Sequence, residues 1–484
     1  MNDTSGVVFP LTADGVRSTS ALGRAVVADA LSGADAVGAR AAEHETNWRG
    51  GYIAHFRRLI EAGLPSASAA QGIAADGLAS LHNRMPVRTD DHEYTLTEAL
   101  RQRAEPPLET AVVSGEGDPE RELVLPYRGS RLKGDALARQ LDRWVESGVI
   151  EGSCAEAVRM VMANPDWLDL SDVRLVTFGA GAEMGPVRAV LRWGGNITAV
   201  DLPQPGIWRS LMDAARRYAG RLHLPVRPGD GSLDARAGAD LVGQLPAVTQ
   251  WLARLDGRLV LGNYAYADGA MHVRVAVAVD ALTSYLADER PDTALSFLAT
   301  PTDVFAVPAE AVEHAVQSYE KRSKLRLIRR PLKILSAGRL LQRHYVPGAD
   351  PGICDSLVPQ QGPNYALAKR LQRWRATTAA AAGHTVSLNV APPTRTRSVM
   401  KNRALAAVYA GAHRFGVEVF EPGTANTLMA ALLVHDLRNP QPPREHPWMD
   451  DAAEAAHGGL WRTAYAPRSA LGLAGIVGIT GART

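Results

Sequence analysis

The stretch from Ser171 to Pro205, SDVRLVTFGAGAEMGPVRAVLRWGGNITAVDLPQP, has the pattern of a strand, a glycine-rich turn, a helix and a second strand. Its glycines are spaced G-x-G-x-x-x-G, one residue longer than the usual dinucleotide-binding fingerprint. We expect Gly179 to permit a tight turn, Gly181 a close approach to a pyrophosphate, and Gly185 the packing of helix on strand. The residues expected at the phosphate are Gly179, Gly181, Ala182, Glu183, Met184 and Gly185.

Asp201 closes the second strand of this unit, about twenty residues past the glycines. A carboxylate at that place binds a ribose 2′-hydroxyl and repels a 2′-phosphate, so the sequence favours NAD over NADP, with NADP as the alternative. A strand-end aspartate that only caps the next turn is the simpler interpretation. Methyltransferases that use S-adenosylmethionine share the glycine-rich turn and the acidic residue, so residues 173–201 alone do not separate the two classes.

The chain beyond this unit continues to alternate strand and helix. The predicted elements are a strand at 221–228, a helix at 238–255, a strand at 257–263, a helix at 270–289 and a strand at 293–304. Such alternation favours parallel strands joined by crossover helices. The sequence therefore predicts an α/β fold with a Rossmann-type, doubly wound parallel sheet.

Tyr365 and Lys369 stand four residues apart in a predicted helix that precedes the strand HTVSLNV and a proline turn. Residues at this spacing share a helix face, so we expect the ammonium to lie beside the phenol and lower its pKa. A tyrosine with a lowered pKa can donate or accept a proton. A Tyr and a Lys that merely share a surface are the alternative.

In this context the pair resembles the active-site helix of the short-chain dehydrogenase/reductase family. The resemblance implies that Tyr365 is the catalytic acid/base and that Lys369 assists it and binds the nicotinamide ribose. It also implies cofactor contacts at the end of the fourth strand and in the proline turn: Asn263, Pro392, Thr394 and Thr396. The chain departs from the family's usual glycine order and has Pro392-Pro393 where the family usually has Pro-Gly.

The serine that this family places shortly before the tyrosine is missing. Thr300 or Thr302, at the end of the fifth strand, could supply the hydroxyl, and Ser356, in the loop before the tyrosine helix, is the other candidate. We favour the threonines because strand ends are rigid. Asp280 takes the place of the asparagine that family members offer to a water relay.

The predicted organisation has a mainly helical N-terminal region, residues 1–168, and a Rossmann-like domain, residues 169–484, interrupted by a basic helical insertion at 305–360. Lysines and arginines gather in the insertion at 321–343 beside an apolar face. Such a segment can contact an anionic membrane surface, hold a phosphate-bearing carrier, or cover the site as a lid.

The bulk composition of the 484 residues carries few further signals. The net charge of +2 and the absence of a reader motif exclude nucleic acid as an expected partner. Cys154 and Cys354 have no metal-binding spacing, the run Glu43-His44-Glu45 lacks a ligand pattern, and we expect no metal. Without a leader-like or membrane-spanning segment in the sequence, a cytoplasmic protein is expected, and we also expect a homo-oligomer.

The function that these residues predict is an NAD(P)-dependent oxidoreductase that interconverts an alcohol and a carbonyl. Its substrate would be a small molecule that is bulky or linked to a carrier. The alternatives are an S-adenosylmethionine-dependent methyltransferase and, on the same fold, a non-redox lyase, epimerase or binding protein.

Overall fold

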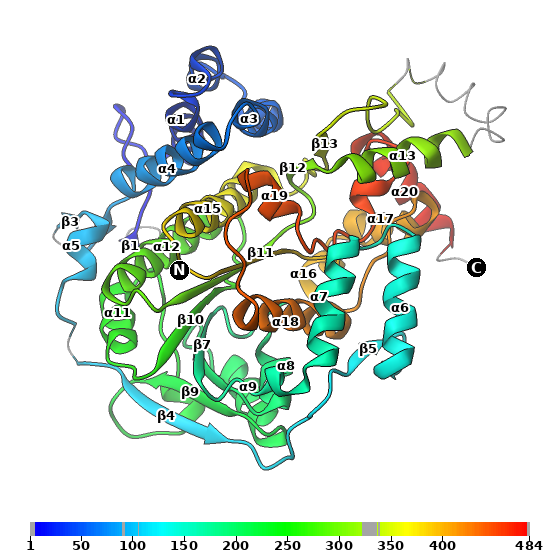
Figure 1. The fold of residues 1–484 in the computed structure, drawn as a ribbon. Helices are drawn as coiled ribbons and strands as arrows, with labels where there is room; N and C mark the ends of the chain where they lie inside the picture. Colours follow the sequence, from blue (N-terminus) through cyan, green and yellow to red (C-terminus); the bar gives the residue numbers. More distant parts are fainter. Residues whose placement is uncertain (1–4, 90–91, 105, 322–335, 337–338, 482–484) are drawn as a thin grey trace.

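The structure, a computed structural model, describes residues 5–89, 92–104, 106–321, 336 and 339–481 (Figure 1). Its centre is a seven-stranded sheet. In spatial order the strands are β14 (Val386–Val390), β11 (Ala294–Ala299), β10 (Arg258–Asn263), β7 (Val173–Phe178), β8 (Asn196–Val200), β9 (Arg221–Val226) and β4 (Glu109–Ser114). All neighbours are parallel except β4, which pairs with β9 antiparallel.

The strand order confirms the predicted Rossmann-type class. From β7 the chain winds outward through β8 to β9, then crosses back and winds the other way through β10, β11 and β14. The direction therefore reverses between β7 and β10. In open parallel sheets, ligands bind at the carboxyl ends of the strands where this reversal occurs.

Helices cover both faces of the sheet. One face carries α11 (Leu245–Ala253), α12 (Ala270–Glu289) and α15 (Gly362–Ala381), and the other carries α8 (Val187–Trp193), α9 (Pro205–Arg217) and α18 (Pro422–Arg438). Successive side chains of β7 point to opposite faces, so Val176 and Phe178 join the first core while Val173 and Leu175 join the second. Burial on both faces explains why these strands are almost continuously apolar.

The N-terminal region packs onto this scaffold at two places. Helices α1 (Thr19–Leu31), α2 (Ala36–Glu43), α3 (Trp48–Gly63) and α4 (Ala67–Arg84) extend the core against α15 and α12. Helices α6 (Gly134–Glu146) and α7 (Gly152–Ala163) pack beside α18. Strand β4 also comes from this region, which the sequence predicts to be mainly helical, so the sheet includes a strand from before residue 169.

The described part of the insertion after β11 contains the antiparallel pair β12 (Val304–Val307) and β13 (Gly352–Asp355) and helix α13 (Ala309–Lys321). Most of the basic segment expected at 321–343 lies outside the described residues. After β14 come α16 (Arg397–Lys401), α17 (Arg403–Gly411), α19 (Pro447–Ala452) and α20 (Pro467–Gly481). The remaining short elements are β1 (Gly6–Val7), β2 (Val87–Arg88), β3 (Glu93–Tyr94), α5 (Leu96–Leu100), β5 (Leu125–Tyr127), β6 (Ser130–Leu132), α10 (Leu233–Arg236) and the 3₁₀ turns Pro165–Leu168, Ala412–Phe415 and Leu460–Arg462.

Within the described part of the chain, none of the helices combines the length and the apolar character needed to cross a lipid bilayer.

Candidate functional site

The glycine-rich turn lies at the carboxyl end of β7, where the strand order reverses. Gly179 has a φ of +79°, and a Cβ there would meet the Cα of Ala265 at 2.6 Å. The turn therefore needs glycine at 179 because the loop after β10 crosses the end of β7 at this point. Gly185 differs, because a Cβ there would make only ordinary contacts, the nearest at 3.5 Å.

Asp201 holds this turn from the end of β8. Its Oδ2 accepts a hydrogen bond from the backbone N–H of Gly181 at 2.7 Å, and its Oδ1 accepts one from the N–H of Leu202 at 2.7 Å. Burial raises the pKa of this carboxyl, and the two amide hydrogen bonds oppose that rise. The Gly181 amide, expected to face a pyrophosphate, thus donates to Asp201. Each carboxylate oxygen keeps further acceptor capacity for a ribose hydroxyl.

The loop that follows β14 contacts the glycine-rich turn after β7. The backbone N–H of Arg397 donates to Glu183 Oε2 at 2.7 Å, and Asn426 Nδ2 of α18 donates to the Glu183 carbonyl at 3.2 Å. Thr396 caps α16, and the Thr394 hydroxyl donates to the Pro392 carbonyl at 2.8 Å. The glycine-rich turn after β7 and the proline turn after β14, both expected to contact a cofactor, are therefore adjacent. Glu183 makes the hydrogen bonds that join them.

Asn263 ends β10 next to the turn, and its side chain is buried. Its Oδ1 has no hydrogen-bond partner among the described residues. A buried amide oxygen without a partner costs free energy, so a ligand that donates a hydrogen bond at this place fits it. The next residue, Tyr264, is buried beside the turn and its hydroxyl lies 2.7 Å from the Ser296 hydroxyl of β11.

Tyr365 lies in the first turn of α15, against the carboxyl end of β11. The hydroxyl of Thr300 is within hydrogen-bond reach of its phenol, and Thr300 also lies 2.8 Å from the hydroxyl of Thr302. The aromatic rings of His272 and Tyr266 pack around Tyr365, with ring centroids 5.4 and 6.3 Å away. The structure thus brings both candidate threonines to the tyrosine.

The prediction that Lys369 lowers the pKa of Tyr365 is wrong for this structure. Burial raises the pKa of Tyr365 to about 12, the hydrogen bond with Thr300 opposes that rise, and the charge of Asp303 adds to it. Lys369 instead points along the strand end, where its Nζ donates to Gln372 Oε1 at 3.0 Å and to the Leu298 carbonyl at 3.4 Å. Burial lowers the pKa of Lys369 to about 8.

His272, in the first turn of α12, is a member of this site that the sequence analysis missed. Its ring is 1% exposed, and neither ring nitrogen has a partner with the geometry of a hydrogen bond among the described residues. Burial, helped by the charge of Lys369, lowers its pKa to about 3, so the imidazole is neutral at neutral pH. A histidine at the start of a predicted helix gave no signal in the sequence, because only the fold brings it to Tyr365.

Asp280 has a different role from the expected water relay. Arg375 of α15 donates to both of its oxygens at 2.8 Å, and His82 of α4 contacts it at 2.7 Å. These partners hold the pKa of the buried carboxyl well below its usual range against the effect of burial. Eight residues along α12 separate it from His272, about 12 Å. Asp280 therefore joins the N-terminal helices to α15.

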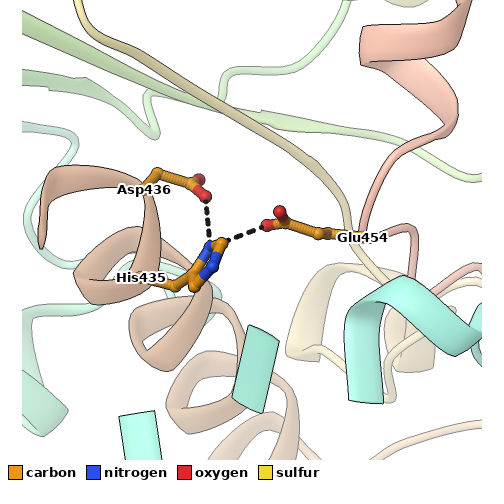
Figure 2. Close-up of side chains that lie close together, drawn as sticks. All are labelled: His435, Asp436 and Glu454. Atoms are coloured by element: carbon orange, nitrogen blue, oxygen red, sulfur yellow. Dashed lines mark hydrogen bonds and ion pairs between the residues drawn. The ribbon is translucent and has the colours of Figure 1, made fainter. Parts of the chain in front are cut away.

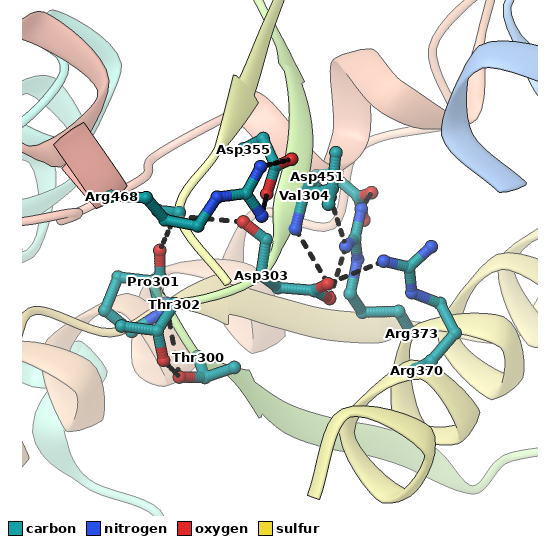
Figure 3. Close-up of polar contacts among 11 residues, drawn as sticks. Thr300, Pro301, Thr302, Asp303, Val304, Asp355, Arg370, Arg373, Asp451 and Arg468 are labelled. Carbon is teal, nitrogen blue, oxygen red and sulfur yellow. Dashed lines mark hydrogen bonds and ion pairs between the residues drawn. The ribbon is translucent and has the colours of Figure 1, made fainter. Parts of the chain in front are cut away.

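A buried ionic network holds the turn that carries Thr300 and Thr302 (Figure 3). Asp303 accepts hydrogen bonds from Arg370 at 2.6 Å and from Arg373 at 2.7 Å, and Arg373 also donates to Asp451 at 2.5 Å. The Ser356 hydroxyl donates to the carbonyls of Pro301 and Asp303 at 2.6 and 2.9 Å. Ser356 thus fixes the backbone of the turn rather than facing Tyr365. Arg370 and Arg373 lie three residues apart in α15. A basic helix on the surface can have the same spacing, so the sequence did not indicate this buried network.

A cavity of about 400 Å³ lies between α17 and the loops around Arg128, Arg395 and Glu418. Tyr409 of α17 lines it; burial, with a smaller electrostatic effect of Tyr365, raises the pKa of Tyr409. The polar side chains around the cavity are Arg128, Ser147, Arg395, Tyr409, His413 and Glu418.

No protein-family model and no curated protein matches this sequence. Among solved structures, it is similar to an A1-type ketoreductase, with 14% identity, 55% of this chain and 46% of that chain covered, and a TM-score of 0.32. A C2-type ketoreductase from a modular polyketide synthase has 15% identity, with 56% of this chain and 48% of that chain covered and a TM-score of 0.31. The terminal R domain from the myxalamid PKS-NRPS biosynthetic pathway has 14% identity, with 54% of this chain and 61% of that chain covered and a TM-score of 0.30. This chain spans about half the length of the first two. The fold class assigned above rests on the strand order of the sheet itself.

Proposed function

We propose that the chain is an NAD(P)-dependent oxidoreductase that interconverts an alcohol and a carbonyl. The observation that carries the proposal is the pairing of Tyr365 with Thr300 at the carboxyl end of β11, on a sheet whose strand order reverses between β7 and β10. A phenol and a hydroxyl within hydrogen-bond reach of each other can both contact one substrate oxygen. The nicotinamide, when bound, would supply or accept the hydride.

The residues that would hold the cofactor are Asp201 at the adenosine ribose, the turn around Gly181, and Asn263 deeper at the sheet edge. Asp201 retains acceptor capacity for ribose hydroxyls and places negative charge where NADP carries a phosphate, which supports NAD as the preferred cofactor. A pyrophosphate that approaches the turn would compete with Asp201 for the Gly181 amide.

Tyr365, Thr300 and Lys369 would have separate roles in the reaction. The Tyr365 phenol, protonated at neutral pH because its pKa is about 12, donates a proton to a developing alkoxide, while Thr300, supported by Thr302, orients the substrate oxygen. Lys369 lies one helical turn away with a pKa near 8, so a bound anionic or hydroxyl-rich group would find it charged at neutral pH. Its ammonium would then be drawn from Gln372 toward the ligand.

The substrate that we propose is bulky or carrier-linked. The cavity of about 400 Å³ beside Tyr409 offers room for a long acyl chain. Arg128 and Arg395 at the cavity pair with Glu418 and Glu421 at 3.4 Å, and an anionic carrier would replace those partners. Helix α17, which carries Tyr409, follows β14 in the chain.

Titration of tryptophan fluorescence with NADH, NADPH and S-adenosylmethionine tests the proposal. We expect saturable binding of NADH, weaker binding of NADPH and no binding of S-adenosylmethionine. If only S-adenosylmethionine binds, the protein is a methyltransferase and the oxidoreductase proposal is refuted. If none of the three binds, the fold serves a non-redox function.

A further inference from the structure

A compact group of three ligand-type side chains lies apart from the proposed active site (Figure 2). His435 and Asp436 come from the last turn of α18, and Glu454 follows α19. The Nδ1 of His435 lies 3.1 Å from Asp436 Oδ1 and 3.4 Å from Glu454 Oε2. All three ligand atoms fall within 4.8 Å of one another.

These separations match the edges of a metal coordination polyhedron. Zinc binds nitrogen and oxygen ligands at about 2.0–2.2 Å in tetrahedral sites, so adjacent donor atoms in such sites lie roughly 3.3 Å apart. The His435 nitrogen has this separation from both carboxylates. A small inward movement of the Glu454 side chain would complete a three-ligand face.

Outer hydrogen bonds hold the proposed ligands in place, as in protein metal sites. Ser387 and Asn389 of β14 donate to Asp436 Oδ2 at 2.6 and 2.9 Å, which leaves Oδ1 directed at His435. Asn439 Nδ2 lies 3.2 Å from Nε2 of His435. When Nδ1 binds a metal, Nε2 carries the ring proton, so the Asn439 amide must turn for its oxygen to accept that proton. The supporting residues come from a strand and from the end of α18, so the group is built on rigid elements.

Space for additional ligands adjoins the cluster. A cavity of about 130 Å³ is lined by Asp436 and Glu454 together with the amide side chains of Asn389, Asn439 and Gln441. It can hold several water molecules, since one water needs only ~10–15 Å³ of such volume. A bound ion would therefore keep open coordination positions on the cavity side.

We propose that His435, Asp436 and Glu454 bind one divalent transition-metal ion, Zn²⁺ in preference to Mn²⁺. Two carboxylates balance the charge of the ion, and one nitrogen with two oxygens is a ligand set that zinc accepts. Binding would release to solvent the Nδ1 proton that His435 now directs at the two carboxylates. The inference is independent of the proposed oxidoreductase function. It departs from the expectation of no metal, because Glu454 is distant in sequence and only the fold brings it to α18.

Isothermal titration of tag-free, chelator-treated protein with ZnCl₂ and MnCl₂ tests the site. We expect one Zn²⁺ per chain, weaker binding of Mn²⁺, and at least a tenfold loss of Zn²⁺ affinity in His435→Gln and in Glu454→Gln. Asp450→Asn is the matched control, because Asp450 lines the same cavity but is not a proposed ligand. Circular dichroism and thermal unfolding establish that each variant is folded.

Cobalt(II) gives a second measurement that needs no variant. The parent protein loaded with one equivalent of Co²⁺ should show visible absorption that Zn²⁺ abolishes by displacement. Absence of saturable Zn²⁺ binding, or equal Zn²⁺ affinity in the parent, His435→Gln and Glu454→Gln, would overturn the proposal. In either case the three side chains form only a buried ion pair.

Discussion

Replacement of Lys369 by methionine should stabilise the protein and impair its proposed activity. Burial holds the pKa of Lys369 near 8 in the folded protein, against 10.5 for an unperturbed lysine. At neutral pH the buried ammonium therefore lowers the free energy of unfolding. Direct conversion of the pKa difference gives about 3 kcal/mol. Loss of the hydrogen bond to Gln372 offsets about 1 kcal/mol. We expect Lys369→Met to raise the free energy of unfolding by about 2 kcal/mol at pH 7.

The pH dependence of this effect has a definite sign. Between pH 8 and 10.5 the unfolded chain binds more protons at this position than the folded protein does, so the stability of the parent rises with pH through that window. Below pH 8 the lysine is charged in both states and its unfavourable contribution is complete. The difference in stability between variant and parent should therefore be constant from pH 6 to 7.5 and shrink as the pH approaches 10.

Urea unfolding at pH 6, 7, 8, 9 and 10, followed by circular dichroism, measures this difference. Lys401→Met is the matched control, because Lys401 is exposed on α16 and its replacement should change stability by less than about 0.5 kcal/mol. A variant less stable than its parent at pH 7, or a gap that stays the same at pH 10, would refute the electrostatic reasoning. NADH affinity should fall in Lys369→Met if the lysine also binds ribose.

Three further substitutions test the site and its support. Tyr365→Phe should leave the fold and NADH binding intact while turnover, once a substrate is found, falls by roughly 10²-fold or more; full activity would assign the proton transfer to another group. Asp201→Asn should reduce the preference for NADH over NADPH at least severalfold in a fluorescence titration, because it removes the charge that opposes the 2′-phosphate, and an unchanged preference would place the ribose elsewhere. Arg370→Met should lower the free energy of unfolding in urea by about 3 kcal/mol, since it breaks a buried pair with Asp303, and a loss below 1 kcal/mol would mean that Arg373 alone satisfies that carboxylate.

The sequence predicted the sheet well because its strands carry a local signal. Each central strand is buried on both faces and is therefore a short apolar run between turn residues, and each crossover helix shows its own periodicity. The predicted helix at 270–289 coincides with α12. The edge strand β4 was missed, because it is largely exposed and follows a proline-rich stretch whose composition resembles a turn.

The candidate site was predicted in part. Spacing alone placed Gly179 in a tight turn, Asp201 near that turn, and Tyr365 on a helix with Lys369. The direction of the pKa shift of Tyr365 was not predictable, since it depends on burial and on where the lysine side chain points. Spacing in the sequence shows which residues share a helix face. It does not show which hydrogen-bond or ionic partner each side chain contacts in the folded protein.

By itself the sequence determined the order of strands and helices, and with it the Rossmann class, because hydrophobic periodicity is a local property of the chain. Only the tertiary structure decided that His272 and Tyr409 surround Tyr365, that Asp280 and Asp303 are neutralised by arginines of α15, and that Glu454 meets His435. The physical reason is that electrostatic and hydrogen-bond partners are set by distances in space between segments far apart in the chain. Those distances follow from how the helices pack on the sheet, which no local pattern encodes.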